Sequence, residues 1–397
     1  MATTVNKNVA IFFDDLTEFY AMRKLVDGLL AKKVNLDIIV PFDSGLSGMP
    51  ESTIREIKKL GYKPLNDAPK NKVYKVILTP YPLNALSRTN YIYNLRTPYS
   101  VVSAKPNPVY TTLMDYDGII CFNQYEPKIL SAYGAECYAV PCWKYYNFKK
   151  EKNDKKTLLI LPTFGQDTIC LEHLSNELLL ELRKHFKVMI KMHHALHFNK
   201  DVEETKNRIK ENVDEFYTSE TPITDLLKRA DIVLSDNSGA IFDSIYSNTP
   251  VACFTKDLNT RHFENIDTLQ HQLAEKGILP CTDKPDELVK ILLSIDKYFK
   301  KQQAAKKEIF IEPDKNAVNH LINVINSYLS RDEKADYQKT LREYRKKQTK
   351  DYLKKINELE IYKQNAEEIF NSKSYRLFTK LKTPVVKINQ LRRKNGK

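Results

Sequence analysis

Short apolar runs alternate with helical patterns along the first half of the chain. The first run, residues 9–13, reads Val-Ala-Ile-Phe-Phe and does not alternate with polar residues. Strands of this kind, separated by helices, are typical of a parallel sheet that is covered on both faces. The pattern predicts strands at 9–13, 34–40, 76–78, 99–102 and 118–121, with helices at 18–33 and 53–60.

A polar cluster at 149–156 interrupts this series, and the alternation restarts after it. The second series predicts strands at 157–161, 186–192, 231–234 and 250–254, with helices at 171–185, 224–229 and 240–247. We therefore expect an α/β protein with two doubly wound, Rossmann-like domains and a cleft between the carboxyl ends of their sheets. The expected segments are a first domain at 1–148, a second domain at 149–330 and a helical basic tail at 331–397.

Composition narrows the class of protein. A chain of 397 residues with 42% hydrophobic residues is long enough for two packed cores, which excludes a wholly disordered chain. Glycine occurs 10 times, and neither G-x-G-x-x-G nor G-x-x-x-x-G-K-[ST] is present, so dinucleotide oxidoreductases and P-loop NTPases lack their usual signature. The six cysteines show no C-x-x-C spacing and are expected to be free thiols of a reducing compartment, without a zinc site or a disulfide framework.

The net charge of +13 belongs almost entirely to the tail. Residues 331–397 contain 20 Lys and Arg against 9 Asp and Glu, whereas the rest of the chain is nearly neutral, so the body is not expected to bind nucleic acid. Residues 371–397 hold nine basic side chains, no acidic one and an apolar helical face, which suits an anionic membrane surface. A disordered basic terminus is the alternative, because Pro384 interrupts the helix.

The segment 337–370 offers a possible seam for self-association. Its members step by three and four residues, over fewer than three heptads, so a coiled-coil contact and a solvated helix both fit; they are Tyr352, Ile356, Leu359, Lys363, Ala366 and Phe370. The first apolar run is too short for a signal peptide, and no run is long enough to span a bilayer. We expect a cytoplasmic protein that is peripheral on the inner face of the cell membrane.

Residues 230–254 carry the clearest chemistry. A predicted strand ends in Ser-Asp-Asn-Ser-Gly at 235–239 and opens at once into the predicted helix from Ala240. Small polar residues there leave the first backbone N–H groups of the helix available to an anion, without a glycine-rich loop. Ser238 and Gly239 allow close approach of a phosphate, and Asp243 can accept hydrogen bonds from ribose hydroxyls. The alternative is that Asp236 and Ser238 only cap the helix.

These residues resemble the nucleotide-binding signature of the CDP-glycerol glycerophosphotransferases, which include the teichoic-acid primases and polymerases and have a GT-B glycosyltransferase-like fold. The family's Asp-x-Ser and Phe-Asp elements correspond to 236–239 and 242–243, followed by Pro250 and a strand. Further matches are the strand at 157–164, the Lys-Met-His at 191–193 and the helix entry at 313–317. The resemblance covers about 157–329.

The resemblance implies a donor site that needs no metal and no cofactor. It places His193 at the diphosphate of the leaving nucleotide, where a donor such as His stabilises the developing charge. The donor-binding residues that it implies are Thr163, Lys191, Asp236, Asn237, Ser238, Gly239 and Asp243. Two other interpretations of His193 remain open: a metal cluster with His194 and His197, and an exposed loop histidine without a role.

The family's acceptor-side histidine has no counterpart here, since residues 1–172 contain no histidine. Asp14 and Asp15 follow the first predicted strand and are candidates for the general base, although capping of the next helix explains them equally well. Tyr81, Tyr93 and Tyr99 are candidates for stacking on a sugar.

Three functions are consistent with these features. The first is transfer of a polyol phosphate from a CDP-linked donor, such as CDP-glycerol, to a lipid-linked cell-wall or capsule polymer. The second is an inverting nucleotide-sugar glycosyltransferase of surface polysaccharide synthesis, which the missing first-domain histidine favours. The third is a non-catalytic partner subunit that keeps the GT-B fold and recruits a working transferase.

Overall fold

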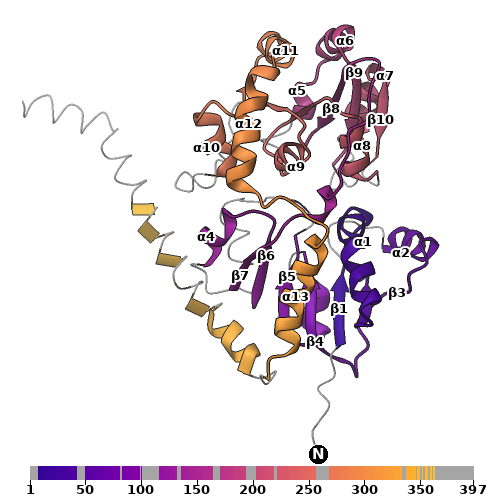
Figure 1. Cartoon of the computed structure of the whole chain (residues 1–397), viewed down its shortest axis with the longest axis vertical. Helices are drawn as coiled ribbons and strands as arrows, with labels where there is room; N and C mark the ends of the chain where they lie inside the picture. The colour runs from indigo at the N-terminus through magenta and orange to yellow at the C-terminus, as the bar shows by residue number, and fades with distance from the viewer. Residues whose placement is uncertain are drawn as a thin grey trace, which may run out of the picture. The chain divides into compact units, whose positions relative to one another are not determined.

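The computed structural model describes residues 8–42, 50–80, 83–98, 100, 116–131, 136–163, 170–193, 203–218, 221–255, 268–332, 337–345 and scattered positions up to 362. The chain divides into two compact units, 1–342 and 343–397. Both parallel sheets belong to the first unit, in which their strands and helices alternate (Figure 1).

The first sheet has seven parallel strands in the order β3-β2-β1-β4-β5-β6-β7. Its strands and helical elements are β1 (Asn8–Phe12), α1 (Leu16–Ala31), β2 (Asn35–Ile39), α2 (Pro50–Lys59), β3 (Pro64–Leu65), β4 (Val73–Thr79), η1 (Asn84–Arg88), β5 (Asn90–Arg96), β6 (Gly118–Cys121), α4 (Glu126–Leu130) and β7 (Glu136–Ala139). The chain crosses to the second sheet through the short helix η4 (Trp143–Tyr145).

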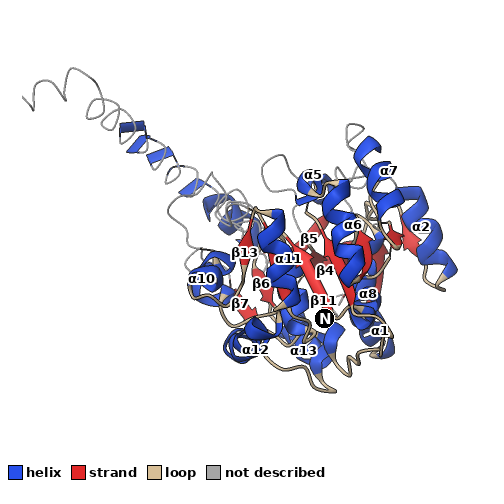
Figure 2. Cartoon of the chain, turned by 90° about the horizontal axis from the view of Figure 1, so that it is seen from above, coloured by secondary structure: helices blue, strands red, loops and turns tan. Residues whose placement is uncertain are grey.

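The second sheet has six parallel strands in the order β10-β9-β8-β11-β12-β13. Its elements are β8 (Thr157–Leu161), α5 (Cys170–His173), α6 (Asn176–His185), β9 (Lys187–Lys191), α7 (Glu203–Asn212), β10 (Glu215–Tyr217), α8 (Ile223–Arg229), β11 (Ile232–Ser235), α9 (Ala240–Tyr246), β12 (Val251–Phe254), α10 (Leu269–Glu275), β13 (Cys281–Thr282), α11 (Pro285–Leu293) and α12 (Asp296–Ile309). The prediction of two doubly wound domains is therefore confirmed (Figure 2).

The strands are apolar throughout because both faces of each sheet are buried. In β1, Val9 and Ile11 belong to one buried cluster, whereas Ala10 and Phe12 belong to another. The first of these clusters extends into the second sheet, where it takes in Leu159 of β8 and further residues of β9 and β11. The two sheet domains thus share a continuous core.

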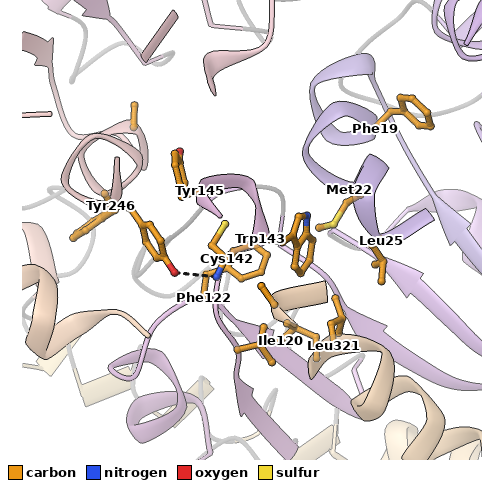
Figure 3. Packing of buried hydrophobic residues seen from close by; sticks show 14 of the residues in the cluster. Phe19, Met22, Leu25, Ile120, Phe122, Cys142, Trp143, Tyr145, Tyr246 and Leu321 are labelled. Atoms are coloured by element: carbon orange, nitrogen blue, oxygen red, sulfur yellow. Dashed lines mark hydrogen bonds between the residues drawn. The ribbon is translucent and has the colours of Figure 1, made fainter. Parts of the chain in front are cut away.

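The crossing between the domains is packed around aromatic residues. Trp143 lies between Phe122 and Met22, and its indole N–H donates to the carbonyl oxygen of Ala21 at 3.0 Å (Figure 3). The hydroxyl of Tyr246, on α9, accepts from the backbone N–H of Cys142 at 3.0 Å. These contacts fix η4 against both domains, beside the cleft.

The last helix, α13 (Ala317–Leu329), lies on the first sheet although the expected second domain, 149–330, includes it. Val318 and Ile322 come so close to α1 that a side chain at Gly28 would meet both, at 2.9 and 3.0 Å. The hydroxyl of Tyr328 donates to the carbonyl oxygen of Asp117 at 3.2 Å. An amphipathic helix shows which face is buried but not which sheet will bury it.

Some predicted elements differ in the structure. The predicted helix 171–185 is interrupted because the Ser175 hydroxyl accepts from the N–H of Leu178 at 3.2 Å and starts α6 there. The strands β5 and β7 were not predicted. The predicted strand 99–102 lies outside the described residues except for Ser100. In β5, Asn and Tyr dilute the apolar signal that the prediction relied on.

The second unit is described at scattered helical positions of 343–362, where Tyr344, Leu359, Ile361 and Tyr362 are exposed. Of the proposed seam, Leu359 is described; its other members, and all of 371–397, lie outside the described residues. Within the described part of the chain, none of the helices combines the length and apolar character that crossing a membrane requires.

Candidate functional site

A cavity of about 630 Å³ lies in the first unit where the two sheet domains meet. It is lined by the carboxyl ends of β8 and β9, the start of α9, one side of α1 and the segment 143–148, which crosses between the two sheet domains. In doubly wound sheets, ligands bind at the carboxyl ends of strands, next to the point where the strand order reverses. Of the residues that the sequence singles out, those lining the cavity are Thr163, Lys191, His193, Ser238, Gly239 and Asp243.

Asp236 lies beneath the cavity rather than in its wall. Its side chain is buried, and both carboxylate oxygens accept from the backbone N–H of Thr163 at 3.1 Å. This contact ties the end of β8 to the turn after β11 and presents Thr163 to the cavity. Asp236 therefore holds Thr163, a residue of the cavity wall, and Asn237 next to it also lies outside the lining.

The turn at 238–239 fits both interpretations of the motif. The Ser238 hydroxyl accepts from the N–H of Ala240, the first residue of α9, at 3.3 Å, although the N-cap position itself is Gly239. The same two residues border the cavity, where Gly239 has no side chain to block a close approach. Capping and ligand contact are thus compatible at this turn.

Asp243 is buried where the two sheet domains meet. The Lys144 ammonium lies 3.0 Å from Asp243 Oδ1, and the Tyr145 hydroxyl donates to the same oxygen. Ser100 donates to Asp243 Oδ2 at 3.3 Å. Burial raises the pKa of Tyr145 well above its ordinary value, and the nearby Asp243 charge adds to this shift, so the hydroxyl keeps its proton.

Lys191 and His193 lie at the carboxyl end of β9 and line the cavity. Burial lowers the pKa of Lys191 to about 8, although the charge of Asp15 opposes the shift. Its ammonium donates to the carbonyl oxygen of Met192 at 3.3 Å. His193 is half-buried. A cation and an imidazole at one strand end can stabilise a phosphate on which negative charge develops.

Asp14 and Asp15 form the entry to α1 and do not line the cavity. Asp15 accepts from the N–H of Glu18 at 2.9 Å, and the Glu18 carboxylate accepts from the N–H of Asp14 at 2.7 Å. Asp15 is thus the N-cap of α1, and the Glu18 side chain reaches back to the residue before it, in an arrangement close to a capping box. The capping interpretation of Asp15 therefore has direct structural support.

Of the three stacking candidates, the structure describes Tyr93. Tyr93 is fully buried against Tyr328, with ring centroids 5.1 Å apart, so the prediction that it binds a sugar face is wrong. Tyr93 belongs to β5, both faces of which are buried at this position. The sequence around Tyr93 does not show this burial. Tyr81 and Tyr99 lie outside the described residues.

His194 and His197 also lie outside the described residues, so the structure does not describe the suggested histidine cluster. In the described part of the chain, no three His, Cys, Asp or Glu side chains are grouped so that they could hold a metal ion. The five cysteines described with their side chains, at 121, 137, 142, 253 and 281, are free thiols, as predicted.

Several cavity residues were missed by the sequence analysis. The missed cations come from elements far apart in the chain, and no motif links them: they are Arg23, Lys24, Arg96, Lys144 and Lys228. Tyr20, Tyr146 and Phe148 contribute aromatic surface. With Lys191, six cationic side chains line the cavity against two aspartates, Asp225 and Asp243, which suits an anionic ligand.

Residues 146–327 match the family model of the CDP-glycerol:poly(glycerophosphate) glycerophosphotransferases. Two teichoic acid glycerol-phosphate primases are similar in sequence. The one from Bacillus spizizenii is 23% identical over 195 residues, 46% of this chain and 49% of the primase. The one from Bacillus subtilis is 29% identical over 124 residues, 29% of this chain and 31% of the primase. The matches thus span about half or less of these relatives.

Solved structures share the fold at low identity. A variant of the wall teichoic acid polymerase TagF soaked with CDPG is 15% identical, with a TM-score of 0.54 over 82% of this chain and 89% of that chain. The UDP-GlcNAc 2-epimerase of Neisseria meningitidis bound to UDP-GlcNAc is 13% identical, with a TM-score of 0.54 over 81% of this chain and 100% of that chain.

The expected GT-B fold is confirmed by these neighbours and by the two parallel sheets. The family match includes Thr163, Lys191, His193 and the turn at 238–239, all of which line the cavity. Residues 146–327, somewhat less than half of the chain, are thus similar to the CDP-glycerol:poly(glycerophosphate) glycerophosphotransferase family.

Proposed function

We propose that this chain transfers a polyol phosphate, such as glycerol phosphate, from a CDP-linked donor to a lipid-linked cell-wall or capsule polymer. The observation that carries the proposal is the cationic cavity whose donor-side wall belongs to the family-matched segment. In this assignment Thr163, Ser238 and Gly239 contact the donor phosphates. Asp236 and Asn237 hold the turn that presents them.

Transfer requires that an acceptor hydroxyl attack the distal phosphorus of the donor. The new P–O bond forms as the bridging P–O bond breaks, and the bridging oxygen leaves with CMP. Negative charge then builds on the leaving nucleotide, where Lys191 and His193 stabilise it. The acceptor hydroxyl loses its proton, for which Asp14 and Asp15 are the candidate bases; their contribution is tested below.

Asp243 is assigned to the donor ribose. Each carboxylate oxygen can accept about two hydrogen bonds. Oδ1 accepts from two described partners, Lys144 and Tyr145. Oδ2 accepts from one described partner, Ser100. A ribose hydroxyl would therefore bind at Oδ2.

A nucleotide-sugar glycosyltransferase is the second candidate. It is favoured by the absence of histidine from residues 1–172, because the acceptor-side histidine is the family feature that this chain lacks. A non-catalytic partner subunit is the third candidate, and the same experiment separates all three.

The purified chain should be incubated with CDP-glycerol, other CDP-alditols, UDP-sugars and GDP-sugars in the presence of acceptor, and nucleotide release measured. We expect CMP release from a CDP-alditol. Release of UDP or GDP instead would establish the second candidate. No release and no thermal shift with any nucleotide would support the third. Replacement of His193 or Ser238 by Ala should lower kcat by about 100-fold with folding intact.

We propose that the C-terminal tail binds the membrane and mediates self-association. Residues 371–397, with nine basic side chains and no acidic one, would bind the anionic inner face of the cell membrane. Residues 337–370 would provide self-association. Both assignments rest on the sequence pattern.

A further inference from the structure

The cavity has two walls with different charge. The first-domain wall consists of the lining residues from the first sheet domain, namely α1, the ends of β4 and β5, and Ser100. Its charged members are Arg23, Lys24 and Arg96, and among the described residues this wall contributes no carboxylate to the lining. The opposite wall carries Lys144, Lys191 and Lys228 with the two aspartates.

On the opposite wall, carboxylates cancel most of the positive charge. Lys144 pairs with Asp243 at 3.0 Å, and both side chains are buried. Lys228 pairs with Asp225 at 2.8 Å. The wall that bears the donor motif is thus left with one lysine, Lys191, that the structure pairs with no lining carboxylate.

On the first-domain wall, the α1 cations retain hydrogen-bond donors that no described residue uses. Arg23 donates through Nε to the Tyr62 hydroxyl at 3.1 Å, and this bond is the largest cause of its raised pKa. Lys24 donates to the carbonyl oxygen of Trp143 at 3.3 Å. Neither forms an ion pair with any described residue. The Arg23 terminal nitrogens and two Lys24 ammonium protons therefore remain for a ligand.

The first-domain cations differ in depth. Arg96, at the end of β5, is 7% exposed, Arg23 is half-buried and Lys24 is exposed. The positive charge of this wall thus runs from the interior of the cavity to solvent. Guanidinium and ammonium groups are the usual partners of phosphate oxygens, arginine through a paired donor geometry.

We infer that the first-domain wall is a second anion subsite, which holds a phosphate ester of the acceptor while the donor occupies the opposite wall. The inference rests on the proposed function, because it places the acceptor opposite the donor motif. The acceptor phosphate can come from a phosphodiester of the growing polymer or from the diphosphate of a carrier lipid. Both present the same oxygens to Arg23 and Lys24.

The test is a titration of the full chain in saturating CDP, which fills the donor side. The two probes are a synthetic glycerol phosphate trimer and a short-chain prenyl diphosphate, and heat of binding is measured. The variant is Arg23→Gln with Lys24→Gln. The control is Lys63→Gln with Lys70→Gln, which removes the same charge from exposed positions of the same domain outside the cavity.

The double variant in α1 should bind the preferred probe about tenfold or more weakly, with CDP affinity changed less than twofold. The control should bind both ligands as the wild type does. The probe that binds tighter identifies the source of the phosphate. Unchanged affinity for both probes, or an equal loss of CDP affinity, would overturn the inference.

Failure of the proposed function has a different signature. If CDP itself does not bind, the same titration is run without CDP. A tenfold loss in the α1 variant would then keep the anion subsite and reject the CDP-linked donor. An intact CDP site together with unchanged probe affinity would reject the subsite and leave the donor assignment standing.

Discussion

The Asp243 carboxylate is held by three side chains from outside its own helix. Lys144 and Tyr145 come from the crossing segment and Ser100 from the first domain. A carboxylate fixed on one oxygen by two donors is preorganised to present the other. Lys144 and Tyr145 are therefore positioning residues for Asp243.

The Lys144→Met variant should bind CDP about tenfold more weakly than the wild type. It should also discriminate less between CDP and 2′,3′-dideoxy-CDP, because Asp243 is no longer aimed at the ribose hydroxyls. Binding of both nucleotides is measured by calorimetry, with Lys144→Arg as the charge-conserving control. An equal loss for both nucleotides would contradict the positioning role and indicate general disruption of the cavity.

Lys191 predicts a pH dependence. Because its pKa is lowered to about 8, the ammonium predominates below that pH and the neutral amine above it. A phosphate contact from the ammonium is thus lost as pH rises, so kcat/KM for the donor should fall through about pH 8. The profile of Lys191→Arg, which stays charged, should remain flat to pH 9. A parallel fall in both proteins would assign the transition to another group.

At the scale of elements, substitutions of Asp15, at the start of α1, can distinguish a capping role from a catalytic one. Asp15→Ala should destabilise the protein by about 1 kcal/mol, because the N–H of Glu18 loses its side-chain acceptor. Asp15→Asn keeps a good cap but cannot take a proton. If Asp15 only caps α1, Asn restores both the melting temperature and kcat. Restored stability with kcat still lowered by 100-fold or more would make Asp15 the general base.

Element boundaries show where local sequence is informative. The strands β6 and β8 match their predicted limits, because each is a short apolar run next to polar turns. β5 and β7 were missed because their strand character depends on neighbours in the sheet more than on their own residues. The interruption at Ser175 had a signal, since serine is a preferred N-cap, but the leucine spacing outweighed it.

At the scale of the whole molecule, the first unit extends past the expected domain boundary at 330. Arg342 Nη1 lies 2.7 Å from Asp117 Oδ2 and donates to the carbonyl oxygen of Ile92 at 2.9 Å. Both side chains of this ion pair are buried. Removal of one partner from a buried ion pair leaves a charge without its counterion and costs about 3–5 kcal/mol.

A chain ended after Asp332 should therefore melt at a clearly lower temperature than the full chain. A chain ended after Phe370 keeps Arg342 and should melt as the full chain does. Arg342→Met in the full chain should reproduce the loss, and calorimetric melting of all four proteins is the measurement. Equal melting temperatures for the two truncations would show that Arg342 contributes little to the first unit.

The basic segment predicts a second effect of truncation. The chain ended after Phe370 lacks 371–397 and should no longer bind vesicles that contain anionic lipid, whereas the full chain should bind them and be released by salt. Neutral phosphatidylcholine vesicles are the control, and sedimentation is the measurement. Retained binding after truncation would place the membrane contact elsewhere.

The fold class and the polar turn at 235–239 followed from the sequence, because their signals are local. Apolar runs report buried strands, and small polar residues between a strand and a helix report an anion-binding turn. Lys191, His193 and the turn at 238–239 were found this way, and the structure brings them to one cavity.

The opposite wall was decided only by tertiary structure. Arg23 and Arg96 are isolated cations in the sequence, and they line the cavity because one side of α1 and the carboxyl end of β5 border it. The partners of Asp243 and the place of α13 likewise depend on contacts between residues about 100 or more positions apart. Such contacts depend on how the elements pack, and no short stretch of sequence records that arrangement.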